Sequence, residues 1–160
     1  MEKKIIKKFG NRLRIRVSGI LVIKNRILLV KHKSLGISGI LWAPPGGGMN
    51  YGMTAAQNLV REFKEETGLS VQTERFLFTH EFLRPPLHAV ELFFEVKSTG
   101  GQLIKGMDPE MLEDEQIIEK VEFIPFRDLI QMDREQVHQV LWDCRTYRDI
   151  IRKRGYIKIE

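Results

Sequence analysis

A glycine-rich loop followed by a sharply bounded helix is the feature that most constrains how this chain can fold. Residues 34–51 contain two adjacent prolines and a triplet of glycines, and this density of breakers predicts an irregular loop with close backbone approach. Directly afterwards, Thr54 and Gln57 have the spacing of a capping box, and Gly68 is a good C-terminal stop. The sequence therefore predicts a helix over residues 54–67, which starts where the loop ends.

Three acidic side chains lie on one face of this predicted helix. Glu62, Glu65 and Glu66 stand at positions i, i+3 and i+4. Like charges at this spacing destabilise a helix by about 0.2–0.5 kcal/mol per pair, and near the C-terminus they also oppose the helix dipole. A divalent cation removes this penalty, because Mg²⁺ and Mn²⁺ prefer carboxylate oxygens. The face is therefore a candidate metal site, beside which Arg61 can hold the Glu65 carboxylate one turn away.

Strand-like and helix-like segments alternate irregularly in the remainder of the chain, which predicts a mixed α/β sandwich. Asn25 can take the left-handed conformation of a tight turn, and Arg84 with the two prolines after it marks another turn. The last segment has an apolar stripe at helical spacing that includes Val140, Cys144 and Ile151. Strands are expected over residues 13–23, 27–32, 76–82, 88–96 and 120–125, and a final helix over residues 134–153.

Composition fits one globular domain over residues 1–160, since 42% of the residues are hydrophobic and 29% are charged. The apolar runs are far shorter than the roughly 20 residues that span a bilayer, and residues 1–8 lack the apolar core of a signal peptide. The single cysteine, Cys144, has no disulfide partner and no nearby residues at zinc-ligand spacing. We therefore expect a soluble cytoplasmic protein without a membrane partner.

The net charge of +5 predicts an anionic partner, although the charge is distributed unevenly. Basic residues gather in residues 3–16, 24–33 and 145–158, whereas residues 108–122 hold seven acidic residues. Solvated surface is the alternative explanation for each of these runs. The basic stretches lack the interleaved aromatic residues of RNA-binding modules, so nucleic-acid binding is not expected.

The histidines form no motif in the sequence. His88 and Glu91 fall on opposite faces of their predicted strand, so only one of them can point into a given site. His32, His80 and His138 give no signal that assigns them a role.

Residues 47–69 resemble the signature of the Nudix hydrolase family, G-x5-E-x7-R-E-U-x-E-E-x-G-U, in which U is an apolar residue. The match runs from Gly47 to Leu69, and a chance match to its R-E-U-x-E-E-x-G core in a chain of this length is on the order of 1 in 10⁴. Residues 42–48 also look like the W-x-x-P-G-G-G lead-in that is common in the family. A less specific resemblance covers residues 10–155, and it implies the Nudix-type α/β/α sandwich with a mixed sheet and a catalytic loop and helix.

The signature is incomplete at one position. Its first glutamate falls on Met53, and Asn50 stands where many relatives carry another acid. In the family, this first glutamate generally matters less for metal binding than the glutamates of R-E-U-x-E-E. The resemblance therefore implies a working enzyme, in which Met53 bears on the rate or on the number of metal ions bound.

The resemblance implies hydrolysis of a nucleoside diphosphate linked to another moiety, such as a nucleoside triphosphate, a nucleotide sugar or ADP-ribose. Water would attack phosphorus with the help of Mg²⁺ or Mn²⁺, and Glu62 would be a metal ligand or the base. The resemblance implies Arg61, Glu62, Glu65 and Glu66 as catalytic residues. The implied metal ligands are Gly47, Glu62, Glu65 and Glu66, with Glu115 or else Glu119 from a distant acidic loop. The implied substrate contacts are Trp42, Gly46, Gly48, Lys31 and Arg84.

Other interpretations stay open for both the site and the function. Trp42 fits core packing as well as stacking on a base, and Lys31, Arg84, Glu115 and Glu119 fit a solvated surface. A nucleotide-sensing domain that does not cleave its ligand is a second function, but the residues after 155 are too few for an output module. An RNA 5′-end pyrophosphohydrolase is a third. The expected partner is a small nucleotide, and a homodimer is compatible with the sequence.

Overall fold

Two β-sheets form the centre of the structure, which is a computed structural model describing residues 3–107, 112 and 116–159. The first sheet has the strand order β5-β1-β7-β6-β9, and in the second sheet β3 pairs with β2, β4 and β8. The pairs β1–β7 and β6–β9 are parallel, whereas the other pairs are antiparallel. The strands are β1 (Arg12–Ile20), β2 (Val22–Ile23), β3 (Arg26–Lys33), β4 (Ile40–Ala43), β5 (Gly46–Gly48), β6 (Leu69–Arg84), β7 (Leu87–Gly101), β8 (Ile118–Pro125) and β9 (Tyr156–Lys158).

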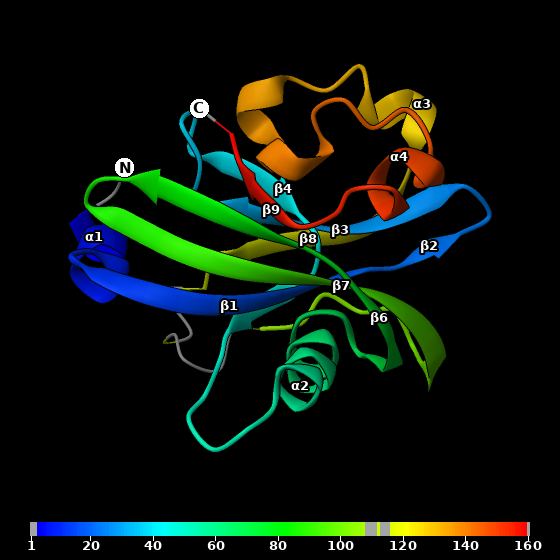
Figure 1. Ribbon diagram of the computed structural model, residues 1–160, viewed down its shortest axis with the longest axis horizontal. Helices are drawn as coiled ribbons and strands as arrows, with labels where there is room; N and C mark the ends of the chain where they lie inside the picture. The colour runs from blue at the N-terminus through cyan, green and yellow to red at the C-terminus, as the bar shows by residue number, and fades with distance from the viewer. Residues whose placement is uncertain (1–2, 108–111, 113–115, 160) are drawn as a thin grey trace.

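Helices cover the sheets from two sides (Figure 1). The long helix α2 lies below the sheets in this view, and the short helices of the C-terminal segment lie above them. The fold is thus an α/β/α sandwich with mixed strand directions, as the sequence predicts. The helices are α1 (Lys3–Phe9), α2 (Ala55–Thr67), α3 (Phe126–Leu129), the 3₁₀ helices η2 (Arg134–Gln136) and η3 (Gln139–Leu141), and α4 (Tyr147–Ile151).

The strand β3 contributes to a hydrophobic core on each of its faces, because successive side chains of a strand point in opposite directions. Leu28 belongs to the core cluster that contains Phe63 of α2. Its neighbours Ile27 and Leu29 belong to the cluster that contains Val140 of the C-terminal segment. Burial on both faces explains the continuous apolar run in this strand.

The helix α2 begins and ends where the sequence predicts. The Thr54 hydroxyl accepts a hydrogen bond from the Gln57 N–H at 3.2 Å, and the Gln57 side chain accepts one from the Thr54 N–H at 2.9 Å. At the other end, Gly68 takes a left-handed conformation with φ of 74°. The capping box and the glycine therefore fix the two ends of the helix that carries the glutamates.

The last turn of α2 is bonded by the segment that follows β7. The Gly106 N–H donates to the Glu66 carbonyl at 2.9 Å, and the Met107 N–H donates to the Glu65 carbonyl at 3.2 Å. The carbonyls in the last turn of a helix have no partner within the helix. These bonds satisfy two of them and hold the backbone of both glutamates.

The prediction of an irregular loop over residues 34–51 is wrong in part, because the structure contains two short strands there, β4 and β5. Gly46, Gly47 and Gly48 pair with β1, and a Cβ on Gly46 would lie 2.1 Å from the Val17 carbonyl oxygen. Such an approach is open only to a residue without a side chain. The glycines thus permit a tightly packed strand in a segment whose composition suggested only breakers.

The expected helix over residues 134–153 is also wrong. The segment forms η2, η3 and α4, separated by turns. Asp133, His138 and Thr146 each act as an N-cap, and each cap starts a new short helix instead of extending the previous one. Val140 and Cys144 of the predicted apolar stripe are nevertheless at most 1% exposed, and Ile151 packs against the same core while partly buried.

The predicted strands all exist, but several bounds differ. The hairpin of β6 and β7 extends well beyond the predicted ranges, and the predicted strand 13–23 is divided into β1 and β2. Asn25 is left-handed with φ of 59°, as predicted, and Lys24 is left-handed as well. The sequence did not predict α1 or β9. Among the described residues, each helix is too short or too polar to cross a membrane.

Candidate functional site

The glycine strand β5 and the helix α2 meet in direct contact. The Gly46 N–H donates a hydrogen bond to Glu66 Oε2 at 2.9 Å, and the Gly48 carbonyl accepts one from Arg61 Nη2 at 3.3 Å. Between them, Gly47 lies against the Glu62 carboxylate, because a Cβ on this glycine would be 2.3 Å from Glu62 Oε1. The structure therefore brings the predicted loop and two of the predicted carboxylates together.

Arg61 joins two of the three glutamates. Its Nη1 lies 2.7 Å from Glu65 Oε2, which is the contact expected one turn along the helix. Its Nη2 lies 2.7 Å from Glu62 Oε1, a contact that the sequence did not predict. The guanidinium group thus holds both carboxylates in defined positions beside β5.

Glu62 and Glu66 are buried residues, with exposed fractions of 8% and 6%. The pKa of Glu62 is raised to about 7, mainly by burial and also by the nearby charge of Glu66, while Arg61 acts in the opposite direction. A raised pKa means that the positive charge near a buried carboxylate does not offset the free-energy cost of ionising it. This is the condition that a divalent cation would relieve.

The donor set of this region fits Mg²⁺ or Mn²⁺. Glu62 lies against the backbone of Gly47, Glu66 is bonded to Gly46, and Mg²⁺ and Mn²⁺ favour such oxygen ligands. Among the described residues, however, the three glutamates do not bring their oxygens into one mutual cluster. Arg61 holds Glu62 and Glu65, whereas Glu66 is turned to the Gly46 N–H. Binding of an ion would therefore rearrange these side chains.

Three other predicted site residues make no contact with the glutamates of α2 that the structure records, and a fourth lies outside the described residues. Lys31 of β3 pairs with Glu119 of β8 at 2.5 Å, and hydrogen bonding to Lys31 lowers the pKa of Glu119. Arg84 is exposed at the end of β6. Glu115 falls outside the described residues. Roles for these residues in binding metal or substrate stay predictions.

Trp42 packs into the core rather than standing open beside the glycines. Only 8% of it is exposed, and it belongs to the cluster that includes Phe78 and Phe93. Its carbonyl accepts a hydrogen bond from the His138 N–H at 2.9 Å. The core-packing interpretation therefore describes its present contacts, and stacking on a base stays a prediction.

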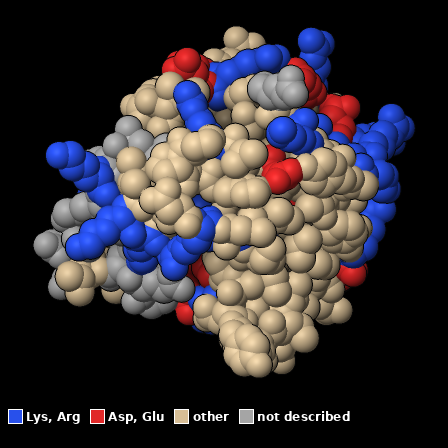
Figure 2. Space-filling view, turned by 60° about the vertical axis from the view of Figure 1, so that its left-hand side comes forward, with Lys and Arg blue, Asp and Glu red and all other residues tan. Residues whose placement is uncertain are grey.

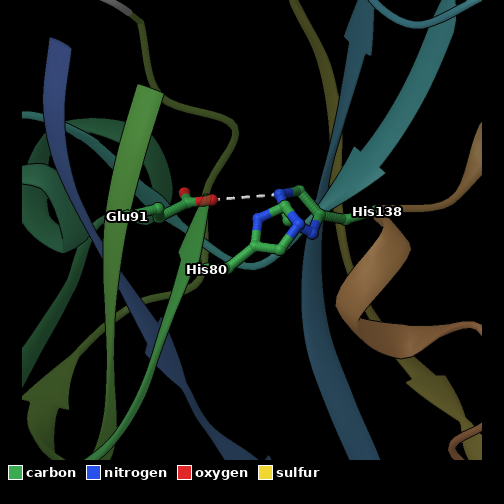
Figure 3. A group of neighbouring side chains, drawn as sticks. All are labelled: His80, Glu91 and His138. Atoms are coloured by element: carbon green, nitrogen blue, oxygen red, sulfur yellow. Dashed lines mark hydrogen bonds and ion pairs between the residues drawn. The ribbon is translucent and has the colours of Figure 1, made fainter. Parts of the chain in front are cut away.

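A second polar group, to which sequence analysis assigned no role, comprises His80, Glu91 and His138 (Figure 3). His138 Nε2 lies 3.0 Å from Glu91 Oε2, and the Ser18 hydroxyl donates to Glu91 Oε1 at 2.6 Å. His80 and Glu91 are paired neighbours on β6 and β7. The predicted hairpin turn could have found the pair of His80 and Glu91. With Arg84 opposite Leu87 across that turn, counting four residues away from it along each strand places residue 80 opposite residue 91.

The environment of this second group perturbs two of its members. The pKa of His80 is lowered to about 4, mainly by burial and also by His138, while Glu91 and the nearby Gln139 side chain act in the opposite direction. Burial alone would raise the pKa of Glu91, but His138, Arg16 and Ser18 outweigh it and hold that pKa well below its usual value. At neutral pH this group therefore contains a neutral His80 and an ionised Glu91.

Comparisons with known proteins show what this chain is similar to. The model of the NUDIX domain matches residues 12–143. The Bacillus subtilis (strain 168) protein YjhB is 34% identical over 97 residues, which are 58% of this chain and 45% of YjhB. The ADP-ribose pyrophosphatase of Methanocaldococcus jannaschii is 33% identical over 117 residues, which are 71% of this chain and 69% of that protein. This chain therefore spans less than half the length of YjhB and about two thirds of the archaeal relative.

Solved structures extend the likeness to the fold. A NUDIX hydrolase from Nitrosomonas europaea superposes with a TM-score of 0.62 at 18% identity, over 74% of this chain and 76% of that chain. At this identity the likeness is one of fold. Because the domain model matches most of the chain and the glutamates stand at its characteristic spacing, this chain belongs to the Nudix family.

Proposed function

We propose that this protein hydrolyses the pyrophosphate bond of a nucleoside diphosphate linked to another moiety, with Mg²⁺ or Mn²⁺ as its cofactor. The observation that carries the proposal is the contact between β5 and α2, where Gly46 bonds to Glu66 and Gly47 lies against Glu62. Carboxylates together with the backbone of a glycine strand supply oxygen ligands for a cation and N–H groups for a phosphate.

Each side chain of this contact fits a step of hydrolysis. With a pKa raised to about 7, Glu62 can accept a proton from water near neutral pH. Arg61 holds Glu62 and Glu65 in position through two contacts of 2.7 Å. Glu65, Glu66 and the Gly47 carbonyl would hold the ion. When bound, a divalent ion neutralises the diphosphate and polarises it toward attack by water.

ADP-ribose is the first substrate to test, because the Methanocaldococcus jannaschii relative bears the name of an ADP-ribose pyrophosphatase. The charge of this protein also suits an anionic ligand, since its net charge is +5. On the face in Figure 2, Lys and Arg side chains are more prominent than Asp and Glu, especially at the left. This charge favours nucleotides in general and does not choose among them.

The test is a substrate screen with the purified protein in Mg²⁺ and in Mn²⁺. ADP-ribose, nucleotide sugars, nucleoside triphosphates and dinucleoside polyphosphates are incubated, and the products are separated by chromatography. ADP-ribose should give AMP and ribose 5-phosphate, and in ¹⁸O-labelled water one of these phosphates should carry the label. Tight calorimetric binding of a nucleotide without turnover of any compound would contradict the proposal and favour a sensing role.

A further inference from the structure

We propose that His80, Glu91 and His138 form a binding site for a zinc-class transition-metal ion, separate from the glutamates of α2. Each residue offers one ligand atom, and these atoms all lie within 4.8 Å of one another. Figure 3 shows the three side chains turned toward a common point between the sheet and the C-terminal segment. This site is independent of the proposed hydrolysis and of its Mg²⁺ or Mn²⁺.

The ligands come from two parts of the fold that are distant in sequence. His80 and Glu91 are opposite one another in the antiparallel pair β6–β7, so their side chains leave the same face of the sheet. His138 precedes η3 in the C-terminal segment, where its own N–H is bonded to the Trp42 carbonyl at 2.9 Å. A bound ion would therefore link the β6–β7 hairpin to the segment that covers it.

His80 provides an independent sign that a ligand is needed here. The residue has an exposed fraction of 0%, and neither ring nitrogen makes a hydrogen bond of normal distance and angle to the described residues. Its ring faces His138, with centroids 5.3 Å apart and planes inclined by 68°. Buried polar atoms without partners are rare and costly in native proteins. A metal ion between the two rings would give one of these nitrogens a partner.

The ligand types select the class of ion. Imidazole nitrogens suit Zn²⁺, Fe²⁺, Co²⁺ and Ni²⁺, whereas Mg²⁺ prefers oxygen ligands alone. Metal–ligand distances of about 2.0–2.2 Å place tetrahedral ligand atoms about 3.3–3.6 Å apart. The ligand atoms now lie within 4.8 Å of one another, so the widest separation must shrink by up to about 1.5 Å. Binding at His138 Nε2 would also place the ring proton on Nδ1. That change breaks a long contact of 3.4 Å from the Val140 N–H, which is a small cost.

Contacts around Glu91 orient it for this role. Ser18 donates to Glu91 Oε1 at 2.6 Å and Arg16 Nε lies 3.5 Å from the same oxygen, which leaves Oε2 facing His138. Such outer contacts fix ligating carboxylates in known metal sites. Ser18 also pairs with Gly46 in the sheet, so the strand that orients Glu91 is the neighbour of the glycine strand. His138 is only partly buried, which leaves a route by which an ion can enter.

The test is a titration of chelator-treated protein with Co²⁺ in the presence of excess Mg²⁺, followed by visible absorption. Mg²⁺ occupies the oxygen ligands of α2, and Co²⁺ bound by imidazole gives a d–d absorption band. One equivalent of Co²⁺ should produce the band, and Zn²⁺ should displace it. Elemental analysis should find one Zn²⁺ per chain after gel filtration. A folded parent protein that gives neither the band nor bound Zn²⁺ overturns the proposal.

Variants locate the ion. His80→Gln and His138→Gln should each weaken Zn²⁺ binding by at least about 100-fold, which is the upper effect of losing an outer contact. His88→Gln is the matched control, because His88 pairs with Glu81 at 2.7 Å away from this group. Glu65→Gln tests the other site and should keep the band. A band that survives in His80→Gln and His138→Gln, or that disappears in Glu65→Gln, overturns the proposal.

A measurement on the parent protein covers the case in which the histidine variants do not fold. The chain has four histidines, and ¹⁵N labelling of their rings gives a separate NMR signal for each side chain. With excess Mg²⁺ present, Zn²⁺ should shift ring-nitrogen signals of His80 and His138 and leave those of His88 unchanged. His32 Nε2 lies 3.7 Å from Glu66 Oε1, so its signal reports on the site of α2 instead. Shifts confined to His32 or His88 would overturn the assignment of the site.

Discussion

The Gly46 N–H donates a hydrogen bond of 2.9 Å to the Glu66 carboxylate, and this bond joins the glycine strand to the helix that carries the acidic residues. Each of the two residues is also held by a backbone contact of its own. Pairing with β1 fixes Gly46, and the Gly106 N–H fixes the backbone of Glu66. The proposed metal site thus rests on regular backbone contacts that can be tested one at a time.

Gly106→Ala tests the support behind the glutamates. A Cβ at this position would lie 1.8 Å from the Glu65 carbonyl oxygen, so the backbone of α2 or of the following segment must move. We expect a stability loss of about 1–3 kcal/mol and reduced hydrolysis, measured by denaturant unfolding and by the substrate assay. Lys105→Ala, an exposed neighbour, should change neither. Equal stability of the Gly106→Ala variant and the parent would show that this packing is less tight than described.

Mg²⁺ or Mn²⁺ should raise the melting temperature of the parent protein. A ligand that binds only the folded state stabilises it, by about 2.7 kcal/mol when its concentration is 100 times Kd. The shift should vanish in the double variant Glu62→Gln/Glu66→Gln, which lacks two buried carboxylates. Differential scanning fluorimetry measures both. An equal shift in the double variant would place the ion elsewhere, with the acidic residues 108–122 as the first region to examine.

The pH dependence of stability should show the raised pKa of Glu62 in metal-free protein. The pKa is about 7 in the folded state and 4.5 for an ordinary glutamate, so the unfolded chain releases this proton first as the pH rises. The Glu62 contribution to stability is therefore complete below about pH 4.5 and is lost by about pH 7. One pKa unit corresponds to about 1.4 kcal/mol, which sets a loss of about 3 kcal/mol as the upper limit.

Glu62→Gln isolates this effect, since glutamine does not titrate. The variant should gain stability relative to the parent as the pH rises from about 5 to about 8, and added Mg²⁺ should reduce this difference. Urea unfolding at several pH values, with a chelator present, measures it. A stability difference that is independent of pH would contradict the raised pKa.

Met53→Glu tests the incomplete signature. Met53 directly precedes the N-cap Thr54 and is only partly buried, so a glutamate should fit and should favour the helix dipole by about 0.3–1 kcal/mol. In an active hydrolase the substitution should maintain or raise kcat. In a sensing domain rebuilt around an apolar residue, it should weaken nucleotide binding and create no turnover. Parallel turnover and calorimetry measurements separate these outcomes, and the second outcome would contradict the proposed function.

Local patterns predict the part of the site that lies on neighbouring residues. The capping box at Thr54 and the stop at Gly68 define α2, and the spacing of Glu62, Glu65 and Glu66 then places them on one face. The contact of Arg61 with Glu65 follows from the same spacing. These features depend on helix geometry within a few residues, which explains why the sequence sufficed.

Long-range packing decided the features that the sequence did not predict. Gly46 was assigned to an irregular loop because the glycine- and proline-rich composition of its segment gives no sign of the pairing with β1. His138 was assigned to a long helix, whereas the structure uses its side chain as an N-cap and bonds it to Glu91. The pairing of His80 with Glu91 could have been counted from the hairpin turn. No local pattern could bring His138 to that pair, because its position depends on the fold of the entire C-terminal segment.

The most direct test of the proposed function compares the parent with Glu65→Gln and Glu66→Gln in the metal-dependent assay. Glutamine keeps the size and helix propensity of glutamate but loses the charge that holds a cation, so each variant should fold normally and lose at least about 100-fold in kcat. Glu74→Gln, at an exposed position on β6, serves as the control and should retain full turnover. Unchanged turnover of both site variants under saturating Mg²⁺ would contradict a metal site on α2 and the hydrolysis proposed from it.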